Sequence, residues 1–236
     1  MNYTWATRTD VGRVRQQNED SVLPDAGSDR SGEHLVAAVA DGMGGAAGGE
    51  IASATAIASV AAVSAEVAIR IEAANLAVIE AASRRPRLKG MGTTLTLGIF
   101  HEDGHLQIGH VGDSRAYLLR DGLLTQVTTD HSFVSEMLAS GRMTAAEAEV
   151  HPYRSVLTRV VGLEAGVEVE VLDIELAAGD RVLICSDGIT TMIDDAAILA
   201  AMAGATDPGD AAEALIAAAN AAGGVDNISA VVVDAG

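Results

Sequence analysis

The chain has 236 residues and a formal net charge of −18, because 33 acidic side chains outnumber 15 basic ones. This charge argues against a nucleic-acid backbone or an anionic membrane surface as a partner, because so acidic a protein repels polyanions. Hydrophobic residues make up 49% of the chain and charged residues 20%, so the sequence predicts a folded domain rather than a disordered chain. The single cysteine, Cys185, excludes an internal disulfide.

The N-terminal region predicts no export or membrane insertion. Residues 1–10 lack the apolar segment of a secretory signal, and residues 52–69 are too weakly hydrophobic for a membrane span. One unpaired cysteine fits a reducing compartment. No repeat or linker-like tract divides the chain. We therefore expect one cytoplasmic domain spanning residues 1–236, with neither membrane nor nucleic acid as partner.

The predicted elements of the first half begin with a strand at residues 35–40, a β-branched and apolar run. An Ala-rich helical region follows at residues 50–85, long enough for two helices with a break near residues 63–66, and it ends at Pro86. Further β-branched runs predict strands at residues 93–100, 106–111 and 116–119.

The second half begins with a weakly patterned, polar segment at about residues 128–162, which carries a short helical piece at 132–140. A strand at residues 181–185, a helix at 208–222 ending at Gly223-Gly224, and a strand at 228–233 complete the prediction. Asp103-Gly104 and Asp121-Gly122 each separate two apolar strands by few residues, which predicts antiparallel hairpins. Such strands, with helices gathered in two blocks, favour a layered α+β architecture.

Several motifs suggest a chemistry that their context does not support. His101 and His105 match the zinc-protease pattern H-E-x-x-H, but a predicted hairpin turn lies between them and is expected to point the imidazoles apart. Residues 42–47 fit a loose dinucleotide fingerprint, but Asp41 immediately before them repels a pyrophosphate. Lys89 is followed by Gly90, so no phosphate-binding P-loop exists, and Cys185 in its apolar strand is predicted to be structural.

Aspartates recur beside small or polar residues near apolar strands. Asp41, Asp113 and Asp187 each follow an apolar run and precede Gly or Ser, and Asp226-Asn227 stands before the last strand. Any one such pair is usually a turn, but four place carboxylates at the rim of a sheet where glycine lets the backbone approach an ion. Oxygen ligands select Mg²⁺ or Mn²⁺. Arg15, close to further acids in residues 15–20, adds a phosphate-binding group.

Six short segments follow one another along the chain: residues 15–20 (RQQNED), 41–45 (DGMGG), 90–94 (GMGTT), 110–115 (HVGDSR), 185–188 (CSDG) and 226–227 (DN). In this order they resemble the metal-dependent Ser/Thr protein phosphatases of the protein phosphatase 2C family, in compact bacterial form. The resemblance implies a four-layer α-β-β-α sandwich of two antiparallel sheets flanked by helices. It also implies that residues 128–162 form a flap beside the cleft.

The resemblance implies a two-metal centre of Mg²⁺ or Mn²⁺. Asp41 would bridge both ions and the Gly42 carbonyl would bind one of them, while Asp187 and Asp226 would hold the other. Asp20 would belong to the same metal site and orient metal-bound water.

Two further roles follow from the resemblance. Asp113, together with Asp187, would serve a third, weaker metal, and Arg15 would clamp the substrate phosphate. The implied reaction is hydrolysis of phosphoserine and phosphothreonine in proteins by metal-activated water, without a phosphoenzyme. The implied partners are targets of Ser/Thr kinases, and the enzyme is expected to be a monomer.

The chain also departs from the family pattern. Met43 stands where animal members carry a histidine proposed as general acid, and Ala46 and Gly48 differ from the residues often found in the glycine loop. Two other functions stay open at this point. One is a non-catalytic relative that binds phosphoproteins or senses metal, and the other is a two-metal phosphoesterase acting on small molecules.

Overall fold

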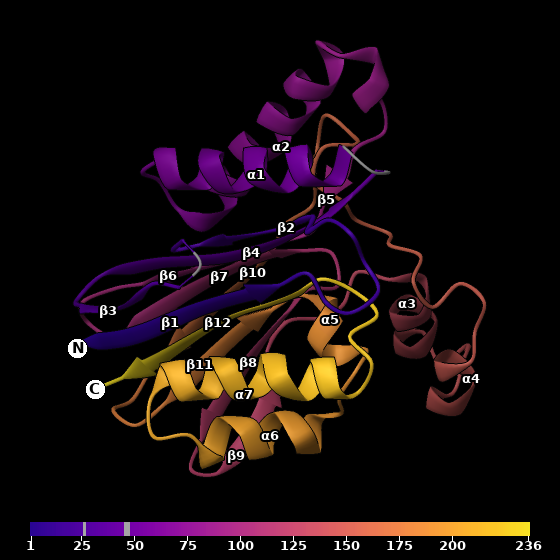
Figure 1. The fold of residues 1–236 in the computed structure, drawn as a ribbon. Helices are drawn as coiled ribbons and strands as arrows, with labels where there is room; N and C mark the ends of the chain where they lie inside the picture. Colours follow the sequence, from indigo (N-terminus) through magenta and orange to yellow (C-terminus); the bar gives the residue numbers. More distant parts are fainter. Residues whose placement is uncertain (26, 45–47) are drawn as a thin grey trace.

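The computed structural model describes residues 1–25, 27–44 and 48–236. They form two antiparallel sheets of six strands packed face to face, with helices on both outer sides (Figure 1). The predicted α+β, four-layer α-β-β-α sandwich is therefore confirmed. None of the helices in this described part of the chain has the length and apolar character that crossing a bilayer requires.

The first sheet, sheet A, has the strand order β3-β1-β12-β11-β8-β9. Its strands are β1 (Tyr3–Asp10), β3 (Asp29–Gly32), β8 (Arg115–Arg120), β9 (Leu123–Gln126), β11 (Arg181–Cys185) and β12 (Ile228–Ala235). The second sheet, sheet B, has the order β10-β7-β6-β4-β2, and β5 pairs with β4 outside this path. Its strands are β2 (Asp20–Leu23), β4 (Leu35–Met43), β5 (Gly92–Thr93), β6 (Leu95–Phe100), β7 (His105–Val111) and β10 (Glu170–Glu175).

The helices lie in two outer layers and one peripheral segment. They are α1 (Gly48–Ala62), α2 (Val67–Ser83), the 3₁₀ helix η1 (Pro86–Leu88), α3 (Phe133–Ala139), α4 (Ala145–Glu149), α5 (Asp187–Thr190), α6 (Asp195–Gly204) and α7 (Pro208–Ala221). Helix α1 packs on β4 and α2 on β6 and β7, whereas α7 packs on β1 and β12. The two helical blocks therefore cover opposite outer faces of the sandwich (Figure 1).

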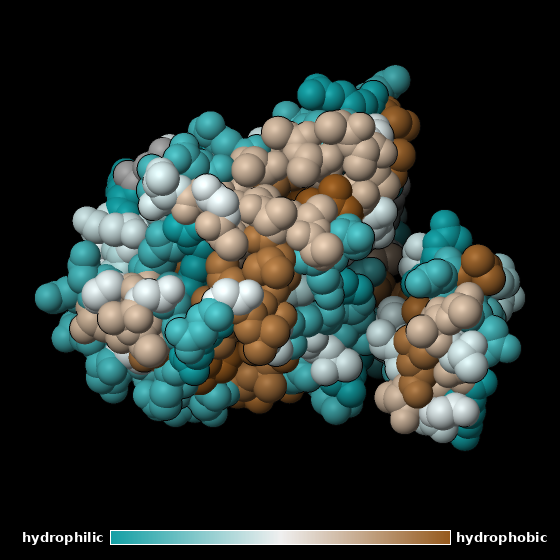
Figure 2. Space-filling model, turned by 90° about the horizontal axis from the view of Figure 1, so that it is seen from below, coloured by the Kyte–Doolittle hydropathy of each residue, from teal (hydrophilic) through white to brown (hydrophobic). Residues whose placement is uncertain are grey.

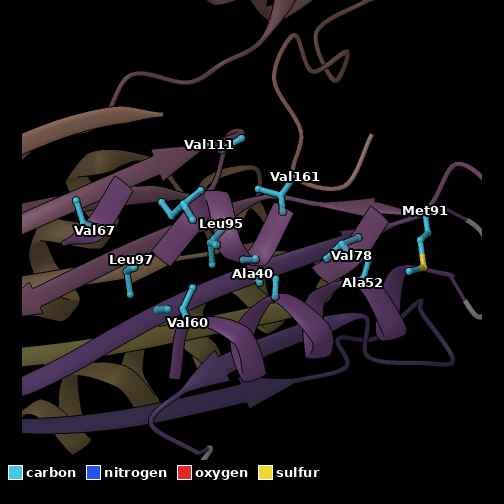
Figure 3. Close-up of a cluster of buried hydrophobic side chains, with 14 of the residues drawn as sticks. Ala40, Ala52, Val60, Val67, Val78, Met91, Leu95, Leu97, Val111 and Val161 are labelled. Atoms are coloured by element: carbon cyan, nitrogen blue, oxygen red, sulfur yellow. The ribbon is translucent and has the colours of Figure 1, made fainter. Parts of the chain in front are cut away.

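Three apolar clusters separate the four layers. The cluster between α1, α2 and sheet B includes Ala52, Val60 and Leu97, all fully buried (Figure 3). A second fills the space between the sheets and contains Phe100 and Ile184 among others, and a third lies under α6 and α7. Burial of these side chains is the main force holding the layers together.

The predicted break in the first helical region is confirmed, because α1 ends at Ala62 and α2 begins at Val67. Arg70 explains how the break is stabilised. Its Nε donates to the Ala65 carbonyl and its Nη1 to the Val60 carbonyl, both at 2.8 Å. These carbonyls lie at the end of α1 and just beyond it, where helical partners are missing.

The predicted strand at residues 93–100 is divided in the structure into β5 and β6 at Thr94. Thr94 leaves the ladder because its amide donates to the Asp41 carbonyl at 2.9 Å. Both predicted hairpins are confirmed, and the β8–β9 turn has the positive φ angles of 52° at Asp121 and 78° at Gly122 that a tight hairpin favours.

The expectation that the β6–β7 turn points His101 and His105 apart is wrong. The two rings stack with centroids 5.5 Å apart and an interplanar angle of 18°. The His101 amide donates to the His105 carbonyl at 2.9 Å, so the two residues close the hairpin as a cross-strand pair. Residues directly opposite one another share a face of the sheet, which brings the side chains together.

The segment at residues 128–162 carries α3 and α4, and the helical piece predicted at 132–140 is confirmed as α3. Ser132 caps α3 by accepting the Ser135 amide, and Thr144 with Glu147 forms a capping box on α4. Figure 2 shows this segment as a lobe set apart from the body of the molecule.

Candidate metal and phosphate site

The carboxyl end of β4 places the first carboxylates of the candidate site. Asp41 on β4 lies opposite Asp20 on β2 in the sheet register, so two acidic residues face each other across neighbouring strands. Thr94 fixes this point, because its Oγ1 accepts the Asp41 amide at 3.0 Å. The site therefore begins where β2, β4 and the start of β6 meet.

Gly42 is required at its position by close backbone contact. A Cβ atom on Gly42 would lie 2.1 Å from the Gly49 carbonyl oxygen and 2.7 Å from that of Glu19. Any side chain would push α1 away from the end of β4. The backbone at Gly42 therefore approaches both the Gly49 and the Glu19 carbonyls, as the Asp-Gly pair in the sequence suggested for a site where backbone comes close to an ion.

Asp187 and Asp113 reach the site from two other loops. Asp187 opens α5 directly after β11, and a Cβ on Gly188 would lie 1.9 Å from the Asn227 carbonyl oxygen. Asp113 follows Gly112, whose φ of +112° and contact with the Thr94 side chain both favour glycine. Glycine therefore allows the Asp187 loop to approach Asn227 and the Asp113 loop to approach Thr94.

Asn227 joins the two ends of the chain at this site. Its Oδ1 accepts the Glu19 amide at 2.8 Å, and its Nδ2 donates to the carbonyls of Val11 and Gln17 at 3.0 and 2.9 Å. The neighbouring Asp226 accepts a hydrogen bond from Arg15 Nη2 at 2.7 Å. The N-terminal loop that carries Arg15 is thus fastened to the turn before β12.

The carboxylates repel one another strongly. Burial first, and then the charges of Asp20 and Asp187, with smaller contributions from Asp113 and Asp226, raise the pKa of Asp41 well above its usual value. Burial also raises the pKa of Asp20 to about 7, although the Ser229 and Ser186 hydroxyls donate to its Oδ2. These mutual effects show that the five predicted aspartates converge.

Asp113 and Asp187 are perturbed in the same direction. Burial and the charge of Asp187 raise the pKa of Asp113 to about 7. Burial and the charge of Asp226 likewise raise the pKa of Asp187. Without a cation, several of these groups hold protons at a pH where isolated aspartates are ionised.

The donor set fits hard divalent cations. All the converging side chains offer oxygen, and Oδ1 of Asp20 and Oδ1 of Asp187 are buried without a hydrogen-bond partner among the described residues. A buried carboxylate oxygen without a partner is unfavourable, and a cation supplies the missing contact. Mg²⁺ and Mn²⁺ prefer such ligands.

The carboxylates open into a cleft of about 1090 Å³. One wall carries Arg15, Glu19 and the aspartates at 41, 113, 187 and 226. The other wall comes from the end of the lobe, where Val156, Leu157, Val160 and Leu163 line the cleft. Arg142 and Arg154 of the lobe are exposed and do not belong to the lining.

A comparison with known protein families shows to which family the chain belongs. The sequence matches the family model described as Protein phosphatase 2C over residues 12–218. The chain belongs to the protein phosphatase 2C family. The resemblance found in the six sequence segments is therefore confirmed.

Individual relatives agree with this assignment. The chain is 42% identical over 241 residues to the serine/threonine protein phosphatase PstP of Mycobacterium tuberculosis (strain ATCC 25618 / H37Rv), which covers 98% of this chain but 44% of PstP. This chain thus spans less than half the length of that relative. It is 34% identical over 240 residues to the serine/threonine phosphatase stp of Listeria monocytogenes (strain ATCC BAA-679 / EGD-e), covering 96% of this chain and 94% of the relative.

A solved structure shows the same fold at similar identity. The catalytic domain of the serine/threonine protein phosphatase PstP in complex with two manganese ions superposes with a TM-score of 0.85. The two are 38% identical, and the match covers 99% of both chains.

Met43 is the departure from the family pattern that the structure places in the cleft. It is 39% exposed and lines the cleft beside Asp41 and Gly42. A thioether carries no proton to donate. Ala46 lies outside the described residues, and Gly48 begins α1 with its Cα facing Met91.

Sequence reasoning missed a buried polar group behind the Asp113 loop of this phosphatase-family fold. Potential ligand atoms of His110, His131 and Glu170 lie within 4.8 Å of one another. Arg159 Nη1 lies 3.1 Å from His131 Nε2, which is unfavourable for a bound cation. The His131 amide donates to the Gly112 carbonyl at 2.7 Å and the Gly112 amide donates to His131 Nδ1 at 3.2 Å, so we interpret His131 as a support for the Asp113 loop.

Other positioning residues were also not predicted. Thr94, Ser186, Ser229 and Asn227 hold the carboxylates or the loops that carry them. The segments GMGTT, CSDG and DN contained three of them, but nothing in their spacing indicated which groups they bind.

Proposed function

We propose that this chain is a metal-dependent protein phosphatase that hydrolyses phosphoserine and phosphothreonine in proteins. The observation that carries the proposal is the convergence of Asp41, Asp113, Asp187 and Asp226 with Arg15 in one cleft, with Asp20 buried opposite Asp41. Membership of the protein phosphatase 2C family and similarity to named Ser/Thr phosphatases support it. The residue roles below are part of the proposal.

The cofactor is proposed to be a pair of Mg²⁺ or Mn²⁺ ions. Asp41 and the Gly42 carbonyl, with Asp187 and Asp226, are the groups that would hold them, Asp20 would support the same site, and Asp113 would serve a third. When bound, the ions would offset the clustered negative charge and lower the pKa of a water molecule. A similar structure that contains two manganese ions supports this proposal.

Arg15 is proposed to bind the phosphate of the substrate. Its guanidinium lines the cleft and its side chain is 49% exposed, so donors remain available beyond the one that bonds Asp226. Asp226 orients the guanidinium toward the carboxylates. A planar guanidinium can form two parallel hydrogen bonds to phosphate oxygens, which positions the phosphorus atom.

A covalent route through cysteine is excluded by burial. Cys185 is fully buried in β11, and burial raises the pKa of its thiol to about 12. The attacking group is therefore assigned to water. No imidazole lies among the described residues that line the cleft, so the leaving oxygen would take its proton from water or from another group at the cleft.

The lobe at residues 128–162 is proposed to act as a flap over the cleft, within a single catalytic domain that works as a monomer. Its end, at Val156 and Leu157, already lines the cleft, while its helices stand apart from the body (Figure 2). The proposed substrates are targets of Ser/Thr kinases.

Phosphate release from a phosphothreonine peptide tests the proposal. We expect release with Mn²⁺, none with excess chelator, and recovery when Mn²⁺ is added again. Asp41→Asn should abolish release, whereas Asp121→Asn, which removes a carboxylate at the β8–β9 turn, should not. Activity in excess chelator, or preferential hydrolysis of nucleotides or sugar phosphates, would contradict the proposal.

A further inference from the structure

The cations of this acidic chain are unevenly distributed. Of the 15 Lys and Arg residues, four lie within residues 84–89, which read RRPRLK. These are Arg84, Arg85, Arg87 and Lys89, and Lys89 is the only lysine. We call residues 84–89 the basic turn. Neither the metal site nor Arg15 uses it.

The side chains of the basic turn are available to a partner. Arg84 pairs with Glu80 one helical turn before it. Arg85, Arg87 and Lys89 are exposed and form no side-chain ion pair or hydrogen bond within the described parts of the chain. Three cations therefore face solvent without a counter-charge.

The backbone of the basic turn is firmly held. Pro86 begins η1, and the Lys89 amide donates to its carbonyl at 3.3 Å. Leu88, between the exposed cations, is 2% exposed and belongs to the core under α1 and α2. A fixed backbone lets a set of charges bind a partner with less loss of entropy than a flexible loop.

A shallow pocket connects the basic turn with the catalytic cleft. It has a volume of about 510 Å³ and is lined by Ile79, Ala82, Ser83, Pro86, Lys89, Gly90, Gly162 and Leu163. Leu163 also lines the cleft, so the two cavities share a wall. A peptide leaving the cleft over Leu163 would meet the basic turn.

Helix α2 keeps this wall in place. The Gly162 amide donates to Asn75 Oδ1 at 2.7 Å, and Asn75 Nδ2 donates to the Glu164 carbonyl at 2.8 Å. A Cβ on Gly162 would lie 2.2 Å from Val78 Cγ1, so the contact depends on glycine. The end of the lobe segment is therefore held against α2, and η1 with the basic turn follows α2 directly in the chain.

The charges favour an anionic partner at this place. The cleft is lined by carboxylates, and the whole chain carries a net charge of −18. A phosphorylated, acidic segment is repelled by most of this surface and attracted by the basic turn next to the cleft. Single exposed ion pairs contribute little, but several cations in one fixed turn act together.

We propose that the basic turn binds an anionic side chain of the substrate protein, a carboxylate or a second phosphoryl group, near the residue that is dephosphorylated. The intervening residues lie over Leu163. This inference rests on the proposed phosphatase activity and adds a substrate preference to it. Arg87 and Lys89 are specificity-determining residues in this arrangement.

Matched phosphothreonine peptides test the preference. One set carries Glu or Asp on either side of the phosphothreonine, a second carries another phosphothreonine there, and a third carries Ser. The wild-type enzyme is compared with the double variant Arg87→Glu/Lys89→Glu. The control is Arg30→Glu/Leu123→Glu/Thr125→Glu, which changes the net charge equally at exposed sites outside both cavities and outside the lobe. A small aryl phosphate reports on the metal site alone.

We expect the wild type to prefer anionic peptides over the Ser peptide. The double variant should lower kcat/KM for anionic peptides by roughly tenfold, as two weak attractions become repulsions. Its kcat/KM for the Ser peptide and the aryl phosphate should change by less than about twofold. Loss confined to the acidic or to the doubly phosphorylated set supports the proposal and identifies the anion.

Three outcomes would overturn the inference: no wild-type preference, an unchanged preference in the double variant, or an equal loss in the control. Each of them leaves the proposed activity intact if the Ser peptide is still hydrolysed with Mn²⁺. Failure of the proposed function is a different result, in which the wild type hydrolyses none of the peptides.

Discussion

Aspartates at the cleft and aspartates of sheet A differ in what they face. On sheet A, Asp234 accepts from Arg181 Nη2 at 2.7 Å and Asp180 from Arg120 Nε at 2.8 Å. At the cleft, Asp41 faces other aspartates. Asp234 and Asp180 each have a cationic partner, whereas the cleft keeps several carboxylates close together with Arg15 bonded to Asp226 at its edge.

The pKa values of Asp180 and Asp41 move in opposite directions. Burial acts to raise the pKa of Asp180, but Arg120 and the Ala177 amide lower it overall. Burial and repulsion raise the pKa of Asp41. A cluster that destabilises the metal-free fold is expected where a bound cation later offsets it, so the difference separates residues kept for stability from residues kept for chemistry.

Asp41→Asn should have the largest effect on activity and separate the two roles. We expect phosphatase activity to fall by roughly 1,000-fold, because the proposed bridging ligand is lost. The melting temperature of the chelator-treated protein should rise by about 2–4 °C, since Asn avoids the cost of burying Asp41 among other carboxylates, which its raised pKa reflects. Calorimetry and phosphate release measure both. A lower melting temperature would show that Asp41 stabilises the fold.

Arg15→Ala removes the cation that lines the cleft and bonds Asp226. The variant loses a charge-assisted contact to phosphate worth about 1.5–3 kcal/mol, so kcat/KM should fall about 10- to 100-fold, mainly through KM. Steady-state kinetics with a phosphothreonine peptide measure this. The matched variant Arg13→Ala, at an exposed position of the same loop, should behave like the wild type. An unchanged KM would make Arg15 a structural ion pair.

Arg120→Met removes the cation that pairs with Asp180, and so tests whether a buried carboxylate without a counter-charge destabilises the fold. Asp180 is 2% exposed and would be left without its counter-charge. We expect the free energy of unfolding to fall by about 2 kcal/mol, less than for a fully buried pair because Arg120 is partly exposed. Denaturant titration measures it. Activity per folded molecule should not change, and a loss of kcat would link the two regions.

The buried imidazole of His110 extends the comparison to the pH dependence of the free energy of unfolding. Burial first, and then the charge of His131, lower the pKa of His110 to about 3. The unfolded chain binds this proton near pH 6.5, so stability from neutral His110 is complete above that pH and is lost as the pH falls toward 3.

The free energy of unfolding should therefore fall by about 1 kcal/mol between pH 7 and pH 5.5 through His110 alone. The groups around it are His131, Glu170 and Arg159. In His110→Asn this part of the pH dependence should disappear, as measured by denaturant titration at both pH values. The same slope in wild type and variant would assign the acid sensitivity to other groups.

Asp41, Asp113 and Asp187 could be predicted because each follows an apolar run and precedes Gly or Ser, a pattern visible in the sequence alone, whereas Asp20 was expected only from the family resemblance. The roles of Asn227 and Ser229 could not be predicted, because they depend on the Glu19 amide and the Asp20 carboxylate, more than 200 positions away. The pairing of His110 with Glu170 likewise depends on the β7–β10 register.

The fold could be predicted from the sequence to about the same extent as the candidate site. The break between α1 and α2 followed from composition, but β1, β2, β3, β10 and α6 were not predicted. In β10, half-buried and exposed positions alternate, with acidic residues among them, which hid the strand. The His101–His105 contact was predicted wrongly, because the turn was considered without the cross-strand pair that closes it.

The position of β12 bears on how the protein matures. This last strand lies between β1 and β11, in the interior of sheet A, and Asp226 and Asn227 stand immediately before it. During synthesis, β1 must therefore wait for β12 before these two neighbours can pair in sheet A. The carboxylate cluster is incomplete until the segment that carries Asp226 has been made, so the candidate site forms only after the segments that carry Asp20 and Asp226 have come together.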